Sequence, residues 1–137
     1  MQPNNLRKFT SNLISAYETE SDDAIREGLL RTSVEKMYYY VFLILREAEL
    51  ALKIKISESS SAHNEVVENL SNILCKQKFL TYKRKLKGLR KERNSATYDL
   101  AYSLNLTEVN AMLLNVNKLL EKLSTEPTIG TYVLQFM

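Results

Sequence analysis

The fold of this chain is decided by residues 24–56, which read AIREGLLRTSVEKMYYYVFLILREAELALKIKI, with no proline and only one glycine. Apolar residues recur there every three or four positions, the spacing of one helix face: Ile25, Leu29, Leu30, Val34, Met37, Val41, Leu45, Ala48 and Leu52. The stripe is widened in its middle by Tyr38, Phe42, Ile44 and Ala51. So wide a stripe is typical of a helix that is buried on two sides. The sequence therefore predicts the central helix of a bundle.

Shorter helical patterns lie on both sides of this central helix. The apolar spacing predicts further helices over residues 3–17, 63–75, 80–102 and 107–124. With 137 residues, 45% of them hydrophobic, the chain is long enough to bury one core. The predicted fold is therefore an all-α bundle of about five helices, formed as a single domain over residues 1–127.

The final segment, residues 128–137, differs from the predicted helices. It reads TIGTYVLQFM, carries no charge and is rich in residues that favour strands. The composition predicts a short, extended, apolar tail. Such a tail either docks on a cognate partner protein or folds onto the core of its own chain. Folding onto the core is the favoured interpretation, and the sequence leaves the other open.

Basic charge is concentrated in one predicted helix. Residues 76–102 read KQKFLTYKRKLKGLRKERNSATYDLAY, and positions 76–93 hold nine Lys or Arg residues against the single acid Glu92. This stretch has a local charge of +8, whereas the whole chain is +3, so all other residues together carry −5. The density favours an anionic partner such as RNA, because each neutralised phosphate releases counterions. A solvated charged face is the alternative. A membrane-surface helix is disfavoured, because the apolar side of the helix is needed for the core.

One arginine stands in the apolar seam of the basic helix. Position 93 continues the helical spacing of Phe79, Tyr82, Leu86 and Leu89, yet it is Arg. A guanidinium that is buried without a partner costs several kcal/mol. The placement therefore predicts either a carboxylate partner from the long helix or a cleft that receives an anion.

A second face of the same helix gathers cations beside the seam. Lys83, Lys87 and Arg90 share this face with Asn94, and Lys91 lies next to it. Cations in such a row can follow a phosphate backbone. We therefore expect Lys83, Lys87, Arg90 and Lys91 to bind nucleic acid.

The rare residue types exclude several classes of site. Three widely spaced glycines exclude a Gly-rich phosphate loop. The single cysteine, Cys75, lies in an apolar run and is predicted to be buried. The single histidine, His63, is predicted to be a capping or surface residue, and with one of each type we expect no metal and no cofactor. The chain has neither a membrane-length apolar run nor a signal-peptide core, which predicts a cytoplasmic protein without membrane association.

The order of these features resembles the HEPN superfamily, small helical domains of toxin–antitoxin and antiphage systems that are associated with RNA cleavage. The matching stretches are SVEKMYYYVFLILREAELAL at 33–52, SSSAHNEVVENL at 59–70 and LRKERNSATYD at 89–99, followed by an amphipathic helix. The family hallmark is an Arg, often with a polar residue after it, and a His shortly downstream. Arg93-Asn94 matches its start, whereas Tyr98 stands where the His would be.

The resemblance implies a homodimer in which two basic helices form a cleft for RNA. Arg93, Asn94 and Tyr98 are its candidate catalytic residues. Free tyrosine has a pKa of about 10, so Tyr98 transfers protons poorly at neutral pH. We therefore expect RNA binding in a defence or toxin–antitoxin context, with impaired cleavage. The alternatives are an active metal-independent ribonuclease that uses these three residues, and a catalytically silent interaction subunit.

Overall fold

The computed structural model describes residues 2–137 and is entirely helical over that range. The helices are α1 (Pro3–Thr19), α2 (Asp23–Ala51), α3 (Ala62–Asn69), α4 (Lys76–Tyr98), α5 (Leu106–Ser124) and α6 (Gly130–Phe136). A short 3-10 helix, η1 (Leu70–Asn72), follows α3. The predicted all-α bundle is confirmed.

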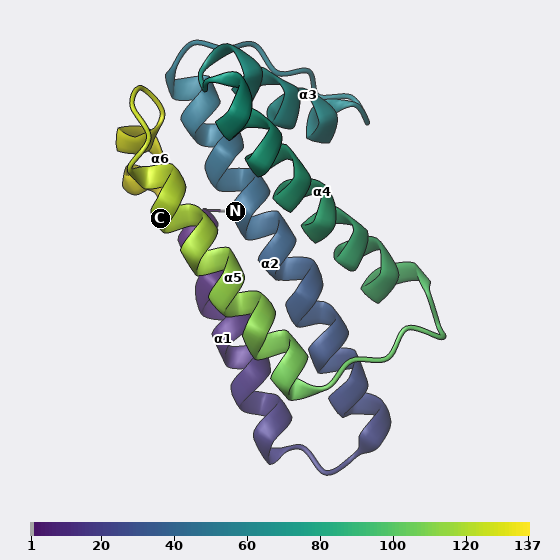
Figure 1. The fold of residues 1–137 in the computed structure, drawn as a ribbon. Coiled ribbons are helices and arrows are strands. Elements are labelled where there is room, and N and C mark those ends of the chain that lie inside the picture. Colours follow the sequence, from purple (N-terminus) through teal and green to yellow (C-terminus); the bar gives the residue numbers. More distant parts are fainter. Residues whose placement is uncertain (1) are drawn as a thin grey trace.

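The long helix α2 is the centre of the bundle. Helices α1, α4, α5 and α6 all pack against it, and α1 runs antiparallel to it as a hairpin (Figure 1). The hairpin turn is closed by Asp22, whose side chain accepts a hydrogen bond from the backbone N–H of Ile25. Such a cap satisfies one of the free N–H groups at the start of a helix. The acidic turn thus begins the central helix.

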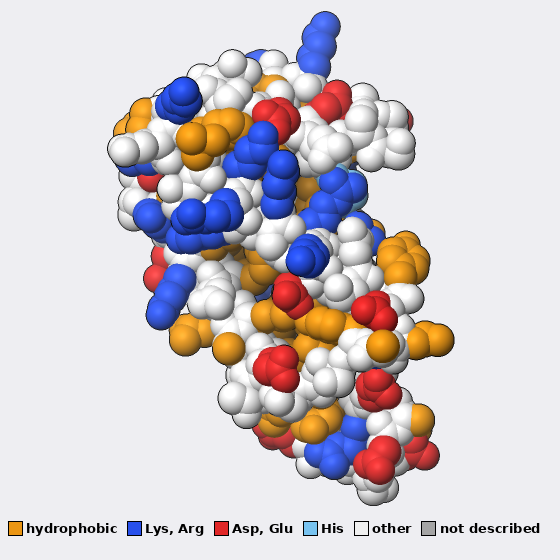
Figure 2. All heavy atoms as spheres, turned by 45° about the vertical axis from the view of Figure 1, so that its right-hand side comes forward, with side chains coloured by type: hydrophobic (Ala, Val, Ile, Leu, Met, Phe, Trp, Pro, Cys, Tyr) orange, Lys and Arg blue, Asp and Glu red, His pale blue; other side chains and the backbone are white. Residues whose placement is uncertain are grey.

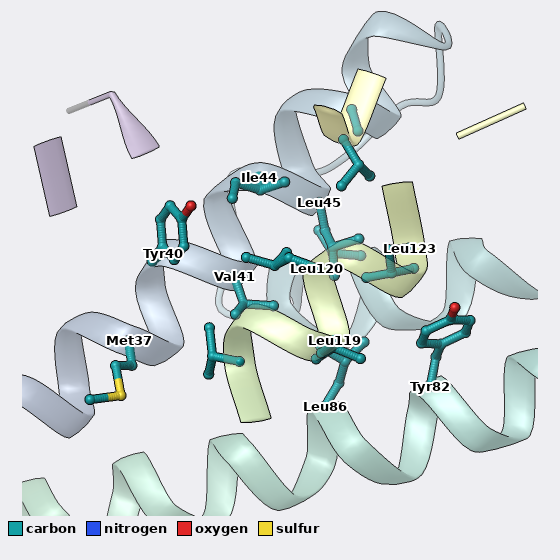
Figure 3. Close-up of a cluster of buried hydrophobic side chains, with 14 of the residues drawn as sticks. Met37, Tyr40, Val41, Ile44, Leu45, Tyr82, Leu86, Leu119, Leu120 and Leu123 are labelled. Carbon is teal, nitrogen blue, oxygen red and sulfur yellow. The ribbon is translucent and has the colours of Figure 1, made fainter. Parts of the chain in front are cut away.

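The core lies between α2, α4 and α5. Figure 3 shows Met37, Tyr40, Val41, Ile44 and Leu45 of α2 beside apolar side chains of the other two helices, Tyr82, Leu86, Leu119, Leu120 and Leu123. All of these side chains are buried. Burying each large apolar side chain contributes roughly 1.5–3 kcal/mol. The two-sided stripe read from the sequence is therefore the contact surface of α2 with α4 and α5.

Arg31 of α2 holds the end of α4 and the loop that follows. Its guanidinium donates hydrogen bonds to the backbone carbonyls of Ala96 at 3.0 Å and Asp99 at 2.9 Å. It donates further bonds to the carbonyls of Leu100 and Tyr102. The last carbonyls of a helix have no partner within it, so this one side chain acts as the cap of α4.

The C-terminal segment corrects the sequence prediction, because it is helical and not extended. Ile129 and Val133 are fully buried, and they stand four residues apart, which is helical spacing. Gly130 packs so closely on the end of α5 that a Cβ there would come within 2.4 Å of the Ser124 carbonyl oxygen. The many strand-favouring residues misled the prediction, since contacts with α2 and α5 decide the conformation of a short segment. Ile129 and Val133 therefore pack against helices of this same chain and are not exposed to a partner protein.

Cys75 is also corrected, because it is exposed and not buried. It lies at the break between η1 and α4, where it is the residue preceding the first turn of α4. The apolar run that contains it ends one residue earlier, at the buried Leu74.

Among residues 2–137, no helix combines the length and the apolarity needed to cross a membrane.

Candidate functional site

A shallow, open depression of about 800 Å³ lies along one flank of α4. We call it the basin, and its lining is Asn64, Lys87, Arg90, Lys91, Asn94, Ser95, Tyr98 and Asp99. Five of the seven site residues expected from the sequence are therefore brought together. On the face of the molecule seen in Figure 2, Lys and Arg side chains gather over one half, while the other half shows mainly hydrophobic and acidic ones.

Lys83 does not line the basin. Its Nζ lies 2.6 Å from the Glu68 Oε1 and 5.5 Å from the centre of the Phe79 ring. The lysine is thus engaged about two turns into α4, in a partly exposed ion pair of the kind that contributes at most about 1 kcal/mol.

Arg93 points to α2 and not into the basin. Its Cζ lies 5.2 Å from the centre of the Tyr38 ring and 5.5 Å from that of Tyr39, which is cation–π geometry. Within residues 2–137, no carboxylate lies at ion-pair distance from Arg93, and its Nε is buried without a hydrogen-bond partner. The seam arginine is therefore held by aromatic rings and not by the glutamate that the sequence suggested.

His63 completes this group from a different helix. Its ring stacks on Phe42 with centroids 4.1 Å apart and on Tyr38 with centroids 5.5 Å apart. Its Nδ1 lies 2.6 Å from the Tyr38 hydroxyl oxygen. His63 and Arg93 thus contact the same tyrosine. We call Tyr38, Tyr39, Phe42, His63 and Arg93 the aromatic cluster.

The surroundings favour the neutral forms of Tyr38 and His63. Burial lowers the pKa of His63, and the positive charges of Arg90 and Arg93 lower it further. Burial raises the pKa of Tyr38, although the same two arginines oppose that shift. The lowered pKa favours the uncharged imidazole at neutral pH, and one of its ring nitrogens then carries a lone pair.

Arg90 joins the basin to the aromatic cluster. Its Nη1 donates a 3.0 Å hydrogen bond to the Asn64 Oδ1, and Asn64 is the neighbour of His63 on α3. Because Arg90 and Asn64 both line the basin, its edge continues directly into the cluster. The cations of α4 and the histidine of α3 can therefore act on one ligand.

Neither His63 nor Asn64 was predicted from the sequence to be a site residue. A motif that is read along one helix contains no information on residues that a neighbouring helix supplies. The available signal was the combination of the triple tyrosine of α2 with the histidine that follows the serine-rich loop.

No family model matches this chain, and neither curated proteins nor solved structures give a significant match.

Proposed function

We propose that this chain is a HEPN-like RNA-binding protein that takes the phosphate backbone of RNA into the basin. The observation that carries the proposal is the lining of the basin, in which Lys87, Arg90 and Lys91 surround the amide of Asn94. Three cations within about one turn of helix, about 6 Å along its axis, lie close enough together to contact neighbouring phosphates of a strand.

The rim of the basin also suits a base of single-stranded RNA. Tyr98 is 75% exposed, so most of its ring is free to stack. Stacking of a base on an aromatic ring contributes about 1–3 kcal/mol and tolerates every base. An exposed ring beside a row of cations favours single-stranded RNA over a duplex, whose bases are already stacked.

The resemblance to HEPN domains extends the proposal to a cytoplasmic homodimer of a defence or toxin–antitoxin system. The aromatic stretch of α2, the Arg93-Asn94 pair of α4 and His63 after the serine-rich loop support it. In such a dimer two basins would face one strand.

Binding of a fluorescent single-stranded RNA across a series of salt concentrations tests the function. We expect affinity to fall steeply with salt, because bound phosphates release counterions. Lys87→Glu weakens binding, whereas Lys85→Glu, the same change two residues earlier on the opposite flank, leaves it nearly unchanged. Equal losses for both variants, or binding that ignores salt, would reject the proposal.

A second candidate function, metal-independent RNA cleavage, is favoured by one observation: His63 contacts the same tyrosine as Arg93. In such a reaction the ribose 2′-oxygen bonds to phosphorus and the bond to the 5′-oxygen breaks. A neutral His63 would accept the 2′-hydroxyl proton, and Arg93 would stabilise the charge on the phosphorus oxygens. The departing 5′-oxygen would take a proton from water, and the hydroxide that is left would take the proton held by His63. This assignment adds a proton-transfer group, His63, which the sequence-based hypothesis with Arg93, Asn94 and Tyr98 lacked.

Incubation of the protein with RNA in EDTA tests cleavage. We expect His63→Ala to abolish it while RNA binding through the basin persists. The rate of the unchanged protein is expected to rise with pH through a value below the ordinary histidine pKa, because His63 must be neutral to act as the base. Cleavage that survives in His63→Ala would exclude the assignment.

A further inference from the structure

A second recess lies on the other side of α4, between α4 and α5. It measures about 560 Å³ and has an apolar floor of Leu89, Met112 and Leu119. Three lysines stand around this floor, Lys85 from α4 and Lys118 and Lys122 from α5. We call it the α4–α5 groove.

The α4–α5 groove is separate from the basin. Residues 85, 88 and 92 line the groove, and residues 87, 90 and 94 line the basin, so each groove position precedes a basin position by two. Two residues along a helix differ by about 200° in direction. The two recesses share no lining residue, and the inference below goes beyond the proposed RNA binding.

The spacing of the lining residues is that of a helix–helix interface. On α5 the lining positions are 112, 115, 118, 119 and 122, which share one face of the helix. A face that holds Met112 and Leu119 among polar positions can pack against an amphipathic partner helix. However, α4 and α5 both pack on α2, and in residues 2–137 no further helix covers the groove between them.

Gly88 keeps the wall of the groove open. It is exposed, and a Cβ at this position would meet nothing within 4 Å. Glycine in the interior of a helix costs about 1 kcal/mol relative to alanine, and the packing of this chain does not require it here. A missing side chain in the wall of a groove permits close approach by another backbone.

The lysines around the α4–α5 groove favour a partner with acidic side chains. Within residues 2–137, none of the three rim lysines has an acid at ion-pair distance. The one acid of the lining, Glu92, already accepts a hydrogen bond from the Tyr102 hydroxyl. The lining therefore carries three lysines against one carboxylate, a net positive charge above an apolar floor. A nucleic-acid strand complements the charge but not the floor, whereas an amphipathic helix with acidic edges complements both.

We propose that the α4–α5 groove receives an acidic amphipathic helix from a partner protein. The apolar face of this helix lies on Leu89, Met112 and Leu119, its backbone approaches Gly88, and its acidic edges pair with the rim lysines. The lined part of α5 spans about three turns, so the partner helix contacts the groove over about 15 Å.

Two designed peptides of about 20 residues, long enough to be helical in isolation, test the groove. Both carry leucine along one face, and they differ only in having Glu or Lys at the edges of that face. Fluorescence anisotropy gives their affinity, and amide chemical shifts show where they bind. We expect the Glu peptide to bind with shifts confined to α4 and α5, and the Lys peptide not to bind.

Variants of the groove make the test specific. Gly88→Leu fills the groove and is expected to weaken binding of the Glu peptide by at least about tenfold. Lys118→Glu is expected to weaken the same binding to a similar degree. Gly28→Leu is the matched control, because Gly28 is equally open but lies on α2 away from the groove. Should Gly88→Leu not fold, the exposed Lys118 still decides the result.

Four outcomes would overturn the proposal. They are equal affinity for both peptides, no binding of either up to about 1 mM, an unchanged affinity in Lys118→Glu, and shifts of the same α5 amides on adding an RNA oligonucleotide or on self-association. Loss of RNA binding alone leaves the groove result intact, so the two proposals fail separately.

Discussion

The two flanks of α4 carry the same kind of side chain but face different neighbours. On the basin flank, Lys87 and Arg90 stand beside the amide of Asn64 and the ring of His63 from α3. On the groove flank, Lys85 stands beside the apolar side chains of Leu89 and Met112. One basic helix thus borders a polar recess on one side and an apolar recess on the other.

The difference shows that the density of charge along a helix does not by itself define a ligand. Phosphates are bound by cations that have further polar groups and exposed rings around them. Cations around an apolar floor fit an amphipathic ligand instead. A test of either flank must therefore compare two variants of equal net charge, one changed in the basin and the other in the α4–α5 groove.

The largest expected effect is on RNA affinity. Reversing the charge of the basin in Lys87→Glu/Arg90→Glu/Lys91→Glu is expected to weaken RNA binding on the order of a thousandfold at low salt, because three phosphate contacts are lost and replaced by repulsion. The matched triple variant, Lys85→Glu/Lys118→Glu/Lys122→Glu, has the same net charge. Equal losses in both triple variants would show that only the overall charge attracts RNA.

The next effect concerns the end of α4, which supports Asn94 and Tyr98. Arg31→Ala removes the donor to four backbone carbonyls, and we expect a loss of about 2–3 kcal/mol in the free energy of unfolding. Urea denaturation measures this loss, and hydrogen exchange locates it.

Exchange in Arg31→Ala is expected to increase near Tyr98 and to stay slow near Lys85, four turns earlier on the same helix. RNA affinity then falls, while peptide binding in the α4–α5 groove is retained. Uniform loosening of α4 would contradict the role of Arg31 as a local cap.

The bundle could be predicted from sequence because its main signals are periodic. The stripe of α2 and the seam of α4 repeat every three or four residues, and a helix translates such spacing directly into a face. The row of Lys87, Arg90 and Asn94 followed from the same rule. Within one helix, therefore, both the fold and the basin were accessible.

The parts that were missed depend on contacts between elements. His63 shares Tyr38 with Arg93 only because α3 packs on α2 and α4, and no spacing along the chain encodes that packing. Residues 128–137 are helical because Ile129 and Val133 find a buried place against other helices. Local composition favoured a strand there, and tertiary packing outweighed it.

The packing of α3, the helix beside the basin, depends on the buried side chain of Glu49. Glu49 of α2 is fully buried, its Oε1 accepts a 2.9 Å hydrogen bond from Asn69 at the end of α3, and its Oε2 has no partner. Burial raises the pKa of Glu49 to about 8 from an ordinary 4.5, although the bond from Asn69 opposes the shift. At neutral pH, α3, which carries His63 and Asn64, is therefore hydrogen-bonded through Asn69 to a protonated Glu49.

Between pH 4.5 and about 8 the folded chain holds this proton and the unfolded chain does not. The free energy of unfolding is therefore expected to fall as pH rises, by up to about 1.4 kcal/mol per pH unit. Glu49→Gln keeps an acceptor for Asn69 and cannot ionise, so urea denaturation at several pH values is expected to show a flatter profile. An identical slope in both proteins would exclude Glu49 as the cause.

The smallest effect tests why Gly88 is a glycine. Gly88→Ala is expected to raise the free energy of unfolding by about 0.5–1 kcal/mol, because alanine favours the helix and its Cβ would meet nothing within 4 Å. Gly130→Ala is expected to have the opposite sign, since its Cβ would come within 2.4 Å of the Ser124 carbonyl oxygen. Thermal and urea denaturation measure both. A gain in stability for Gly88→Ala with a loss for Gly130→Ala would show that the fold requires Gly130 but not Gly88, whose open side is left for a partner. A loss of stability in both variants would mean that the chain itself already packs against the groove wall at Gly88.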